Sequence, residues 1–183
     1  MVETQEIQVV KPEDLVRQYG EDSLTQIAVR ALQAGRDLRM KGFSGSQDAL
    51  AMSAIYGQVK QTYVVVLSNN EEAAYYRNDL EQLMPNEEIM FFPTSYKKAY
   101  EYTKIENANV LQRSETLNAI NELGGEPCII ITYPDALNEK VINQRSLREN
   151  TLSAKVGEAL DTGFMMELLQ EYGFKKEDYV YEV

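Results

Sequence analysis

The stretch that decides the fold reads KGFSGSQDAL, residues 41–50. A phosphate-binding loop has the pattern G-x-x-x-x-G-K-[ST], in which backbone N–H groups and the lysine hold the phosphates and the hydroxyl binds Mg²⁺. With Gly42 as the first glycine, the second glycine falls on Gln47, the lysine on Asp48 and the hydroxyl residue on Ala49. The stretch has the outline of a phosphate loop without its chemistry, because a carboxylate replaces the cation that a polyphosphate needs.

The residues on either side predict a strand, a glycine turn and a helix. Residues 38–43 are interpreted as a strand leading into the turn, and residues 46–59 have an apolar face at helical spacing. A helix N-terminus after such a turn is a place where anions bind, here at Gly42, Gly45 and Ser46. Alternatively, the glycines serve only the backbone geometry of a tight turn. For nucleotide hydrolysis the second interpretation is favoured, and weak binding of a phosphate or sulfate stays open.

Short apolar runs and helical patterns alternate along the chain. Three more runs, apolar on both faces, are typical of interior strands of a parallel sheet: residues 63–67, 89–92 and 128–133. Helical spacing is found in residues 23–33, which Gly35 would end, and in residues 71–83 and 107–123. The alternation predicts an α/β layered domain with a mainly parallel sheet, flanking helices and right-handed crossovers.

The two ends of the chain follow different patterns. Residues 1–22 carry little periodicity and are interpreted as a partly ordered lead-in. After residue 150 the sequence predicts a strand over 151–156, a helix over 161–172 capped by Asp161 or Thr162, and a strand over 178–183. We therefore expect one domain over residues 1–149 and, over 150–183, the beginning of a truncated second α+β module.

Composition excludes several classes of function. The chain has 183 residues, 18 Lys and Arg against 29 Asp and Glu, a net charge of −11, no histidine and one cysteine, Cys128. The acidity opposes non-specific DNA binding. The absence of histidine excludes histidine-based catalysis, and with one cysteine it excludes a structural zinc site and an intrachain disulfide. No signal peptide or apolar run of membrane-spanning length is present, so we expect a cytoplasmic protein that binds neither membrane nor metal.

Three further segments were weighed as sites. Residues 91–104 interleave aromatics with lysines, which suits base stacking and phosphate contacts, but a strand end with a solvated loop is the favoured interpretation. Residues 145–148, with Lys140 nearby, form a basic segment that either faces solvent or contacts a partner. The acidic pairs at 71–72 and 87–88 suit helix N-termini or solvent. No nucleophile is accompanied by a recognisable base, so no catalytic residue is predicted.

The order and spacing of these motifs resemble the N-terminal UvrB-like region of the bacterial transcription-repair coupling factor, Mfd. The glycine stretch is similar to that family's G-[LF]-x-G-S-x-x-A-L segment. Arg113 and Leu117 fall where the family has an "R…aL" helix. The other matching segments are residues 63–69, 71–83, 92–93, 100–101, 129–137 and 156–180, with Phe174 in place of the family's tyrosine.

The resemblance implies a degenerate P-loop NTPase-like domain, similar to UvrB domain 1a, followed by the start of a domain 2-like module. It implies that no cofactor binds and that this region is not an enzyme; the loop concerned comprises Gly42, Gly45, Ser46, Gln47, Asp48 and Ala49. The full-length family protein is an ATP-dependent DNA translocase of the bacterial cytoplasm that displaces stalled RNA polymerase and recruits UvrA. Between Phe92 and Cys128 there is no room for the DNA-gripping hairpin of UvrB.

Three hypotheses about function follow. The first is a non-catalytic scaffold in a transcription-repair coupling factor, whose contacts with other domains of the same protein mask the UvrA site. The second is a nucleotide-dependent enzyme with an atypical loop, which would need a lysine from elsewhere to replace Asp48. The third is an independent acidic adaptor that binds a basic partner through a tyrosine-rich surface.

Overall fold

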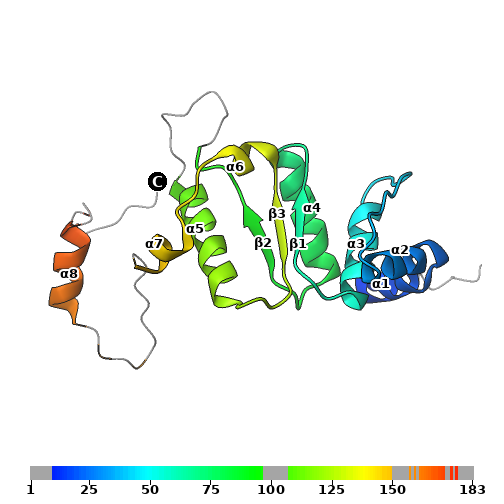
Figure 1. The fold of residues 1–183 in the computed structure, drawn as a ribbon, viewed down its shortest axis with the longest axis horizontal. Coiled ribbons are helices and arrows are strands. Elements are labelled where there is room, and N and C mark those ends of the chain that lie inside the picture. The colour runs from blue at the N-terminus through cyan, green and yellow to red at the C-terminus, as the bar shows by residue number, and fades with distance from the viewer. Residues whose placement is uncertain are drawn as a thin grey trace, which may run out of the picture. The chain divides into compact units, whose positions relative to one another are not determined.

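The computed structural model describes residues 10–96, 107–149, 157, 159, 161–171, 174 and 176. The chain divides into two compact units, Met1–Val141 and Ile142–Val183. The elements of the first unit are drawn in Figure 1; in chain order they are α1 (Pro12–Glu21), α2 (Ser23–Gln33), α3 (Gln47–Gln58), β1 (Tyr63–Val66), α4 (Asn70–Leu83), β2 (Ile89–Phe92), α5 (Asn107–Glu122), β3 (Ile129–Thr132) and α6 (Pro134–Asn138).

The three strands form a parallel sheet in the order β1-β3-β2, which confirms the predicted α/β layering. In the register, Val65 of β1 lies opposite Ile131 of β3, and Phe91 of β2 lies opposite the same residue from the other side. The connection through α4 passes over the position that β3 later fills. β3 is therefore the interior strand, and all four of its residues are buried.

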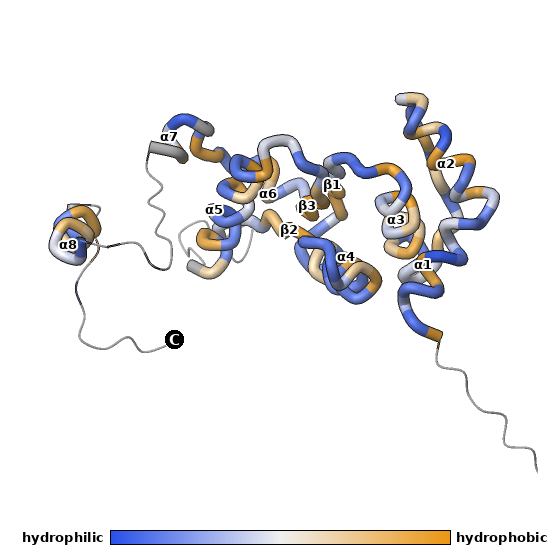
Figure 2. Tube along the Cα trace, turned by 90° about the horizontal axis from the view of Figure 1, so that it is seen from below, coloured by the Kyte–Doolittle hydropathy of each residue, from blue (hydrophilic) through white to orange (hydrophobic). Residues whose placement is uncertain are grey.

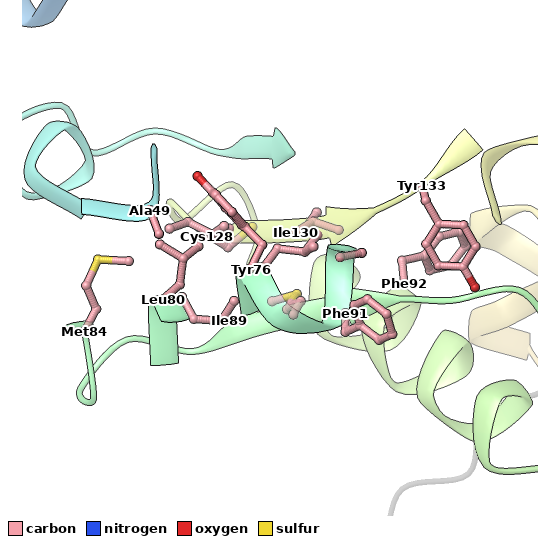
Figure 3. Close-up of a cluster of buried hydrophobic side chains, with 14 of the residues drawn as sticks. Ala49, Tyr76, Leu80, Met84, Ile89, Phe91, Phe92, Cys128, Ile130 and Tyr133 are labelled. Carbon is pink, nitrogen blue, oxygen red and sulfur yellow. The ribbon is translucent and has the colours of Figure 1, made fainter. Parts of the chain in front are cut away.

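The main core lies between the sheet and its helices. α4 and α5 lie on opposite faces of the sheet (Figure 2), and α3 packs beside α4. Leu80, Ile129 and Ile131 are completely buried in the cluster shown in Figure 3, which also holds the thiol of Cys128. Burying one such aliphatic side chain stabilises the fold by about 1.5–3 kcal/mol. The short apolar runs thus pack as their sequence predicted.

The two faces of the sheet are covered unequally. Val64 and Val66 of β1 point to the α5 side and are 57% and 49% exposed, whereas Ile130 and Met90 in the neighbouring strands are buried. A helix is about 10 Å across and strands lie about 4.8 Å apart, so one helix covers two strands. α5 packs on β2 and leaves the outer face of β1 open.

Local signals in the sequence set the helix ends. The carboxylate of Asp22 accepts hydrogen bonds from the backbone N–H groups of Leu24 (2.8 Å) and Thr25 (3.3 Å), which caps α2. At the other end Gly35 has φ +64°, and the N–H of Arg36 donates to the carbonyl of Ala31 at 2.9 Å. This is the glycine-ended helix that the sequence predicted.

Two predictions about the N-terminal part are wrong. Residues 38–43 form no strand; they run as irregular chain beside the helices, and their apolar side chains lie against α1 and α2 without pairing with the sheet. The lead-in contains α1, which the low hydrophobicity of Pro12–Glu21 concealed. Proline in its first turn, followed by Glu13 and Asp14, favours this helix start.

The second unit contains α7 (Gln144–Glu149) and α8 (Thr162–Glu171). The prediction that Asp161 caps the second of these helices is confirmed, because its carboxylate accepts from the N–H groups of Gly163 (2.9 Å) and Phe164 (3.1 Å). The strands predicted over 151–156 and 178–183 lie outside the described residues.

Candidate functional site

The glycine turn forms as predicted in its backbone. Gly42 has φ +89° and Gly45 has φ +55°, both in the left-handed region that other residues rarely adopt. A side chain at either position would meet no neighbour, so conformation alone calls for glycine there. Ser46 then precedes α3 without capping it through its hydroxyl.

Side chains of the turn itself occupy amides that a phosphate would need. The N–H of Ser44 donates to Oε1 of Gln47 at 2.9 Å, and the N–H of Ala49 donates to Oδ1 of Asp48 at 2.8 Å. In a phosphate loop such N–H groups point at the ligand. Here a neutral amide oxygen and a carboxylate already accept from them, and the carboxylate repels an incoming anion.

Ala49 holds the position of the metal-binding hydroxyl and belongs to the core. It is completely buried and lies in the cluster with Leu80 and Tyr76 (Figure 3). The hydroxyl of Tyr76 reaches the carbonyl of Asp48 at 3.5 Å, and burial raises the pKa of that tyrosine, with Asp48 and Asp79 adding to the effect. The start of α3 is therefore packed against α4 from below.

The missing strand changes what precedes the turn. In a phosphate loop a sheet strand leads directly into the glycines and fixes them at the sheet edge. Residues 38–43 do not supply that strand, so the turn has a helix after it and irregular chain before it. The context that favoured anion binding is only half present.

A second polar cluster, missed by the sequence, lies at the carboxyl ends of the strands. The guanidinium of Arg113 on α5 is 6% exposed and donates through Nη1 to the carbonyls of Pro93, after β2, and Ala136, after β3. It also stacks on the ring of Phe92 at 4.0 Å and lies 3.8 Å from Oε2 of Glu139. We call these groups the arginine cluster; one guanidinium joins the ends of two strands.

Charge and burial act in opposite directions on this arginine. Burial lowers the pKa of Arg113, and the carboxylate of Glu139 opposes that shift. Nη2 of Arg113 is buried and has no hydrogen-bond partner among the described residues. That atom is closed off from solvent, so the guanidinium serves packing and strand linkage and is not placed to meet a ligand.

Next to this cluster the residues after all three strands line a polar pocket of about 380 Å³: Asn69–Glu71 after β1, Thr94 and Tyr96 after β2, and Tyr133 and Asp135 after β3. Ligands of open α/β sheets bind at this edge. The hydroxyl of Tyr133 accepts from the N–H of Thr94 at 2.9 Å, so part of the lining is already paired. Two carboxylates in the lining oppose a polyphosphate.

The remaining predicted sites are dispersed. Phe91 and Phe92 are buried core residues that cannot stack on bases, and residues 97–104 lie outside the described part of the chain. Lys140 and Arg145 are exposed. Glu87 forms an ion pair with Lys60 at 2.7 Å. The described ranges contain no group of three or more potential metal-ligating side chains among His, Cys, Asp and Glu.

Comparisons with known proteins add no family. No protein-family model matches the sequence, and no curated protein matches it. None of the helices in the described part of the chain is long and apolar enough to cross a bilayer.

Proposed function

We propose that this chain is a non-catalytic scaffold, corresponding to the N-terminal UvrB-like region of a transcription-repair coupling factor. The observation that carries the proposal is the state of the glycine turn. Its amides are occupied by Gln47 and Asp48, and Ala49, where an active loop has a hydroxyl, is completely buried. A degenerate P-loop-like domain of this kind would keep its architecture and contribute binding surfaces.

The alternative of a nucleotide-dependent enzyme needs a substitute for the missing loop lysine. Lys41 is the nearest lysine in the sequence, and it lines a groove formed with α1, α2 and α3. Glu71 and Asp135 at the strand ends add negative charge. Both observations weigh against phosphate binding and so favour the scaffold.

The adaptor hypothesis relied on a tyrosine-rich surface. Tyr56, Tyr76 and Tyr133 are buried, while Tyr75 is 74% exposed. Much of the tyrosine content therefore serves the core, which weakens this hypothesis.

Calorimetric titration with ATP and Mg²⁺ tests the proposal. We expect no binding tighter than about 1 mM, equivalent to about −4 kcal/mol. A micromolar dissociation constant for ATP would refute the non-catalytic assignment. The triple variant Gln47→Gly, Asp48→Lys and Ala49→Thr serves as the comparison: it frees one amide and adds a cation, so weak phosphate binding without hydrolysis is the expected gain.

The gene gives an independent check of the family. The resemblance predicts a reading frame that also encodes a helicase-type motor. If the gene encodes no such motor, the coupling-factor assignment is wrong, whatever the nucleotide titration shows.

A further inference from the structure

The N-terminal helices form an open apolar groove. Its volume is about 680 Å³, and it lies between α1, α2, the start of α3 and the irregular residues 38–43; we call it the N-terminal groove. Six large apolar side chains line it and are still at least 37% exposed: Leu15, Leu24, Ile27, Leu38, Met40 and Phe43. Exposed apolar groups gathered in one concave surface mark an interaction site, whereas scattered ones do not.

The helices around this groove are fixed to one another. Beneath it Ala28, Val29 and Ile55 form a small separate core between α2 and α3. The side-chain amide of Gln26 donates to the carbonyl of Gly20 at 2.6 Å and to Oε1 of Gln58 at 2.8 Å, which links all three helices. The groove is therefore preformed, and a ligand need not order it.

The charge around the groove is opposite to that of the whole chain. Between residues 23 and 46 there are four cations and one carboxylate, while the complete chain has a net charge of −11. Arg39 and Lys41 line the groove, are exposed, and have no ion-pair partner among the described residues. Asp22 also lines it, but its carboxylate accepts from the amides at the start of α2.

We propose that the N-terminal groove binds an amphipathic helix whose apolar face is flanked by acidic residues. A helix places large side chains at positions i, i+3, i+4 and i+7 into such a groove. Glutamates beside that face would meet Arg39 and Lys41. This inference is independent of the nucleotide question and of the family assignment.

An anionic membrane shares this chemistry but fits the chain less well. Apolar groups with a basic rim also suit a lipid surface. The groove is concave, and an extended anionic surface would come close to the rest of a chain with net charge −11. A helix can contact the basic rim alone, because charges farther than about 8–10 Å are screened at physiological salt.

The probe is a fluorescent synthetic peptide of about four turns, with leucine at the four anchor positions and glutamate on both flanks. A second peptide carries lysine in place of every glutamate. Measured by anisotropy on the full chain, the glutamate peptide should bind with a dissociation constant of about 100 µM or tighter, and the lysine peptide at least about tenfold more weakly.

Matched variants locate the site. Ile27→Glu, on the 52% exposed groove residue, should weaken binding at least about tenfold, whereas Tyr75→Glu on the surface of α4 should leave it within about twofold. The double variant Arg39→Glu with Lys41→Glu should reverse the preference between the two peptides. Lys140→Glu with Lys176→Glu changes the net charge equally and should not. Circular dichroism confirms folding of each variant.

Several results would overturn the proposal. These are no binding of the glutamate peptide up to about 1 mM, equal binding of both peptides, or the same loss with Tyr75→Glu as with Ile27→Glu. Flotation with anionic vesicles, without peptide binding, would assign the groove to lipid instead. Self-association in sedimentation that disappears with Ile27→Glu would assign it to a second copy of the chain.

Discussion

The carboxyl edge of the sheet and the N-terminal groove differ in what they leave unsatisfied. At the sheet edge, polar groups that would serve a ligand are used by the protein itself: Arg113 binds two carbonyls and Tyr133 accepts from Thr94. In the groove, Leu24 and Ile27 stay largely exposed and two cations lack partners among the described residues.

The difference teaches where to look for function in this molecule. A closed polar cluster adds stability and unites distant strands, but offers nothing to bind. An open apolar surface costs stability, because water contacts it in the free state. Substitutions at the edge should therefore change folding, and substitutions in the groove should change binding alone.

The largest effect is expected for Arg113→Met. The variant leaves the carbonyls of Pro93 and Ala136 without their donor and Glu139 without its cation. Breaking such a buried set costs about 2–4 kcal/mol in the free energy of unfolding, measured by urea denaturation. Arg77→Met, which removes a surface ion pair with Glu81, should cost less than about 1 kcal/mol. Equal losses in both variants would contradict the comparison.

A smaller loss is expected at the start of α3. Ala49→Thr forces a larger, polar side chain into a completely buried position and should cost about 1–3 kcal/mol. Asp48→Lys reverses a partly exposed charge in the first helical turn, so its cost should be about 0.3–1 kcal/mol. Urea unfolding of both variants checks the order. The reverse order would show that charge, and not packing, controls this turn.

Alkaline pH should loosen the closed core next. Burial raises the pKa of Tyr76 above its ordinary value of 10.0, so the folded state keeps a proton that the unfolded chain loses more readily. The stabilisation is complete below pH 10 and decreases as the pH rises beyond it, by about 1.4 kcal/mol per pH unit for one such group. In Tyr76→Phe the decline between pH 10 and pH 11 should be shallower. An unchanged slope in thermal unfolding would exclude this tyrosine as its source.

The smallest effect on folding is expected in the groove. Ile27→Glu places a charge on a side chain that is already 52% exposed, so the free energy of unfolding should change by less than about 0.5 kcal/mol. On the same helix, Val29→Glu buries a charge at a position that is 4% exposed and should unfold the N-terminal helices. Thermal melts of the pair measure the contrast. A large loss from Ile27→Glu would mean that the groove belongs to the core.

Elements with strong local signals were predicted within one or two residues. β2 ends where Pro93 follows, and α2 lies between the Asp22 cap and Gly35, as expected. Residues 38–43 alternate apolar and basic side chains, which is typical of a strand, but pairing with a sheet is a tertiary event that alternation cannot establish.

The candidate sites were predicted less completely. The substitutions at positions 48 and 49 were readable, since the spacing of a phosphate loop is local. The burial of Arg113 was not, because it depends on carbonyls from two strands distant in the chain. Thr116, three residues along α5, bonds the carbonyl of Phe91, so a helix with Arg and Thr on one face was the available signal. The groove joins segments whose apolar residues have no common period.

The thiol of Cys128 gives the chain a built-in reporter. It is the sole sulfhydryl in the sequence, 6% exposed, and precedes the interior strand directly. An alkylating reagent can reach it only when the sheet opens, so the labelling rate divided by that of a free thiol yields an opening equilibrium. Every substitution above can thus be ranked by mass spectrometry, with no engineered label.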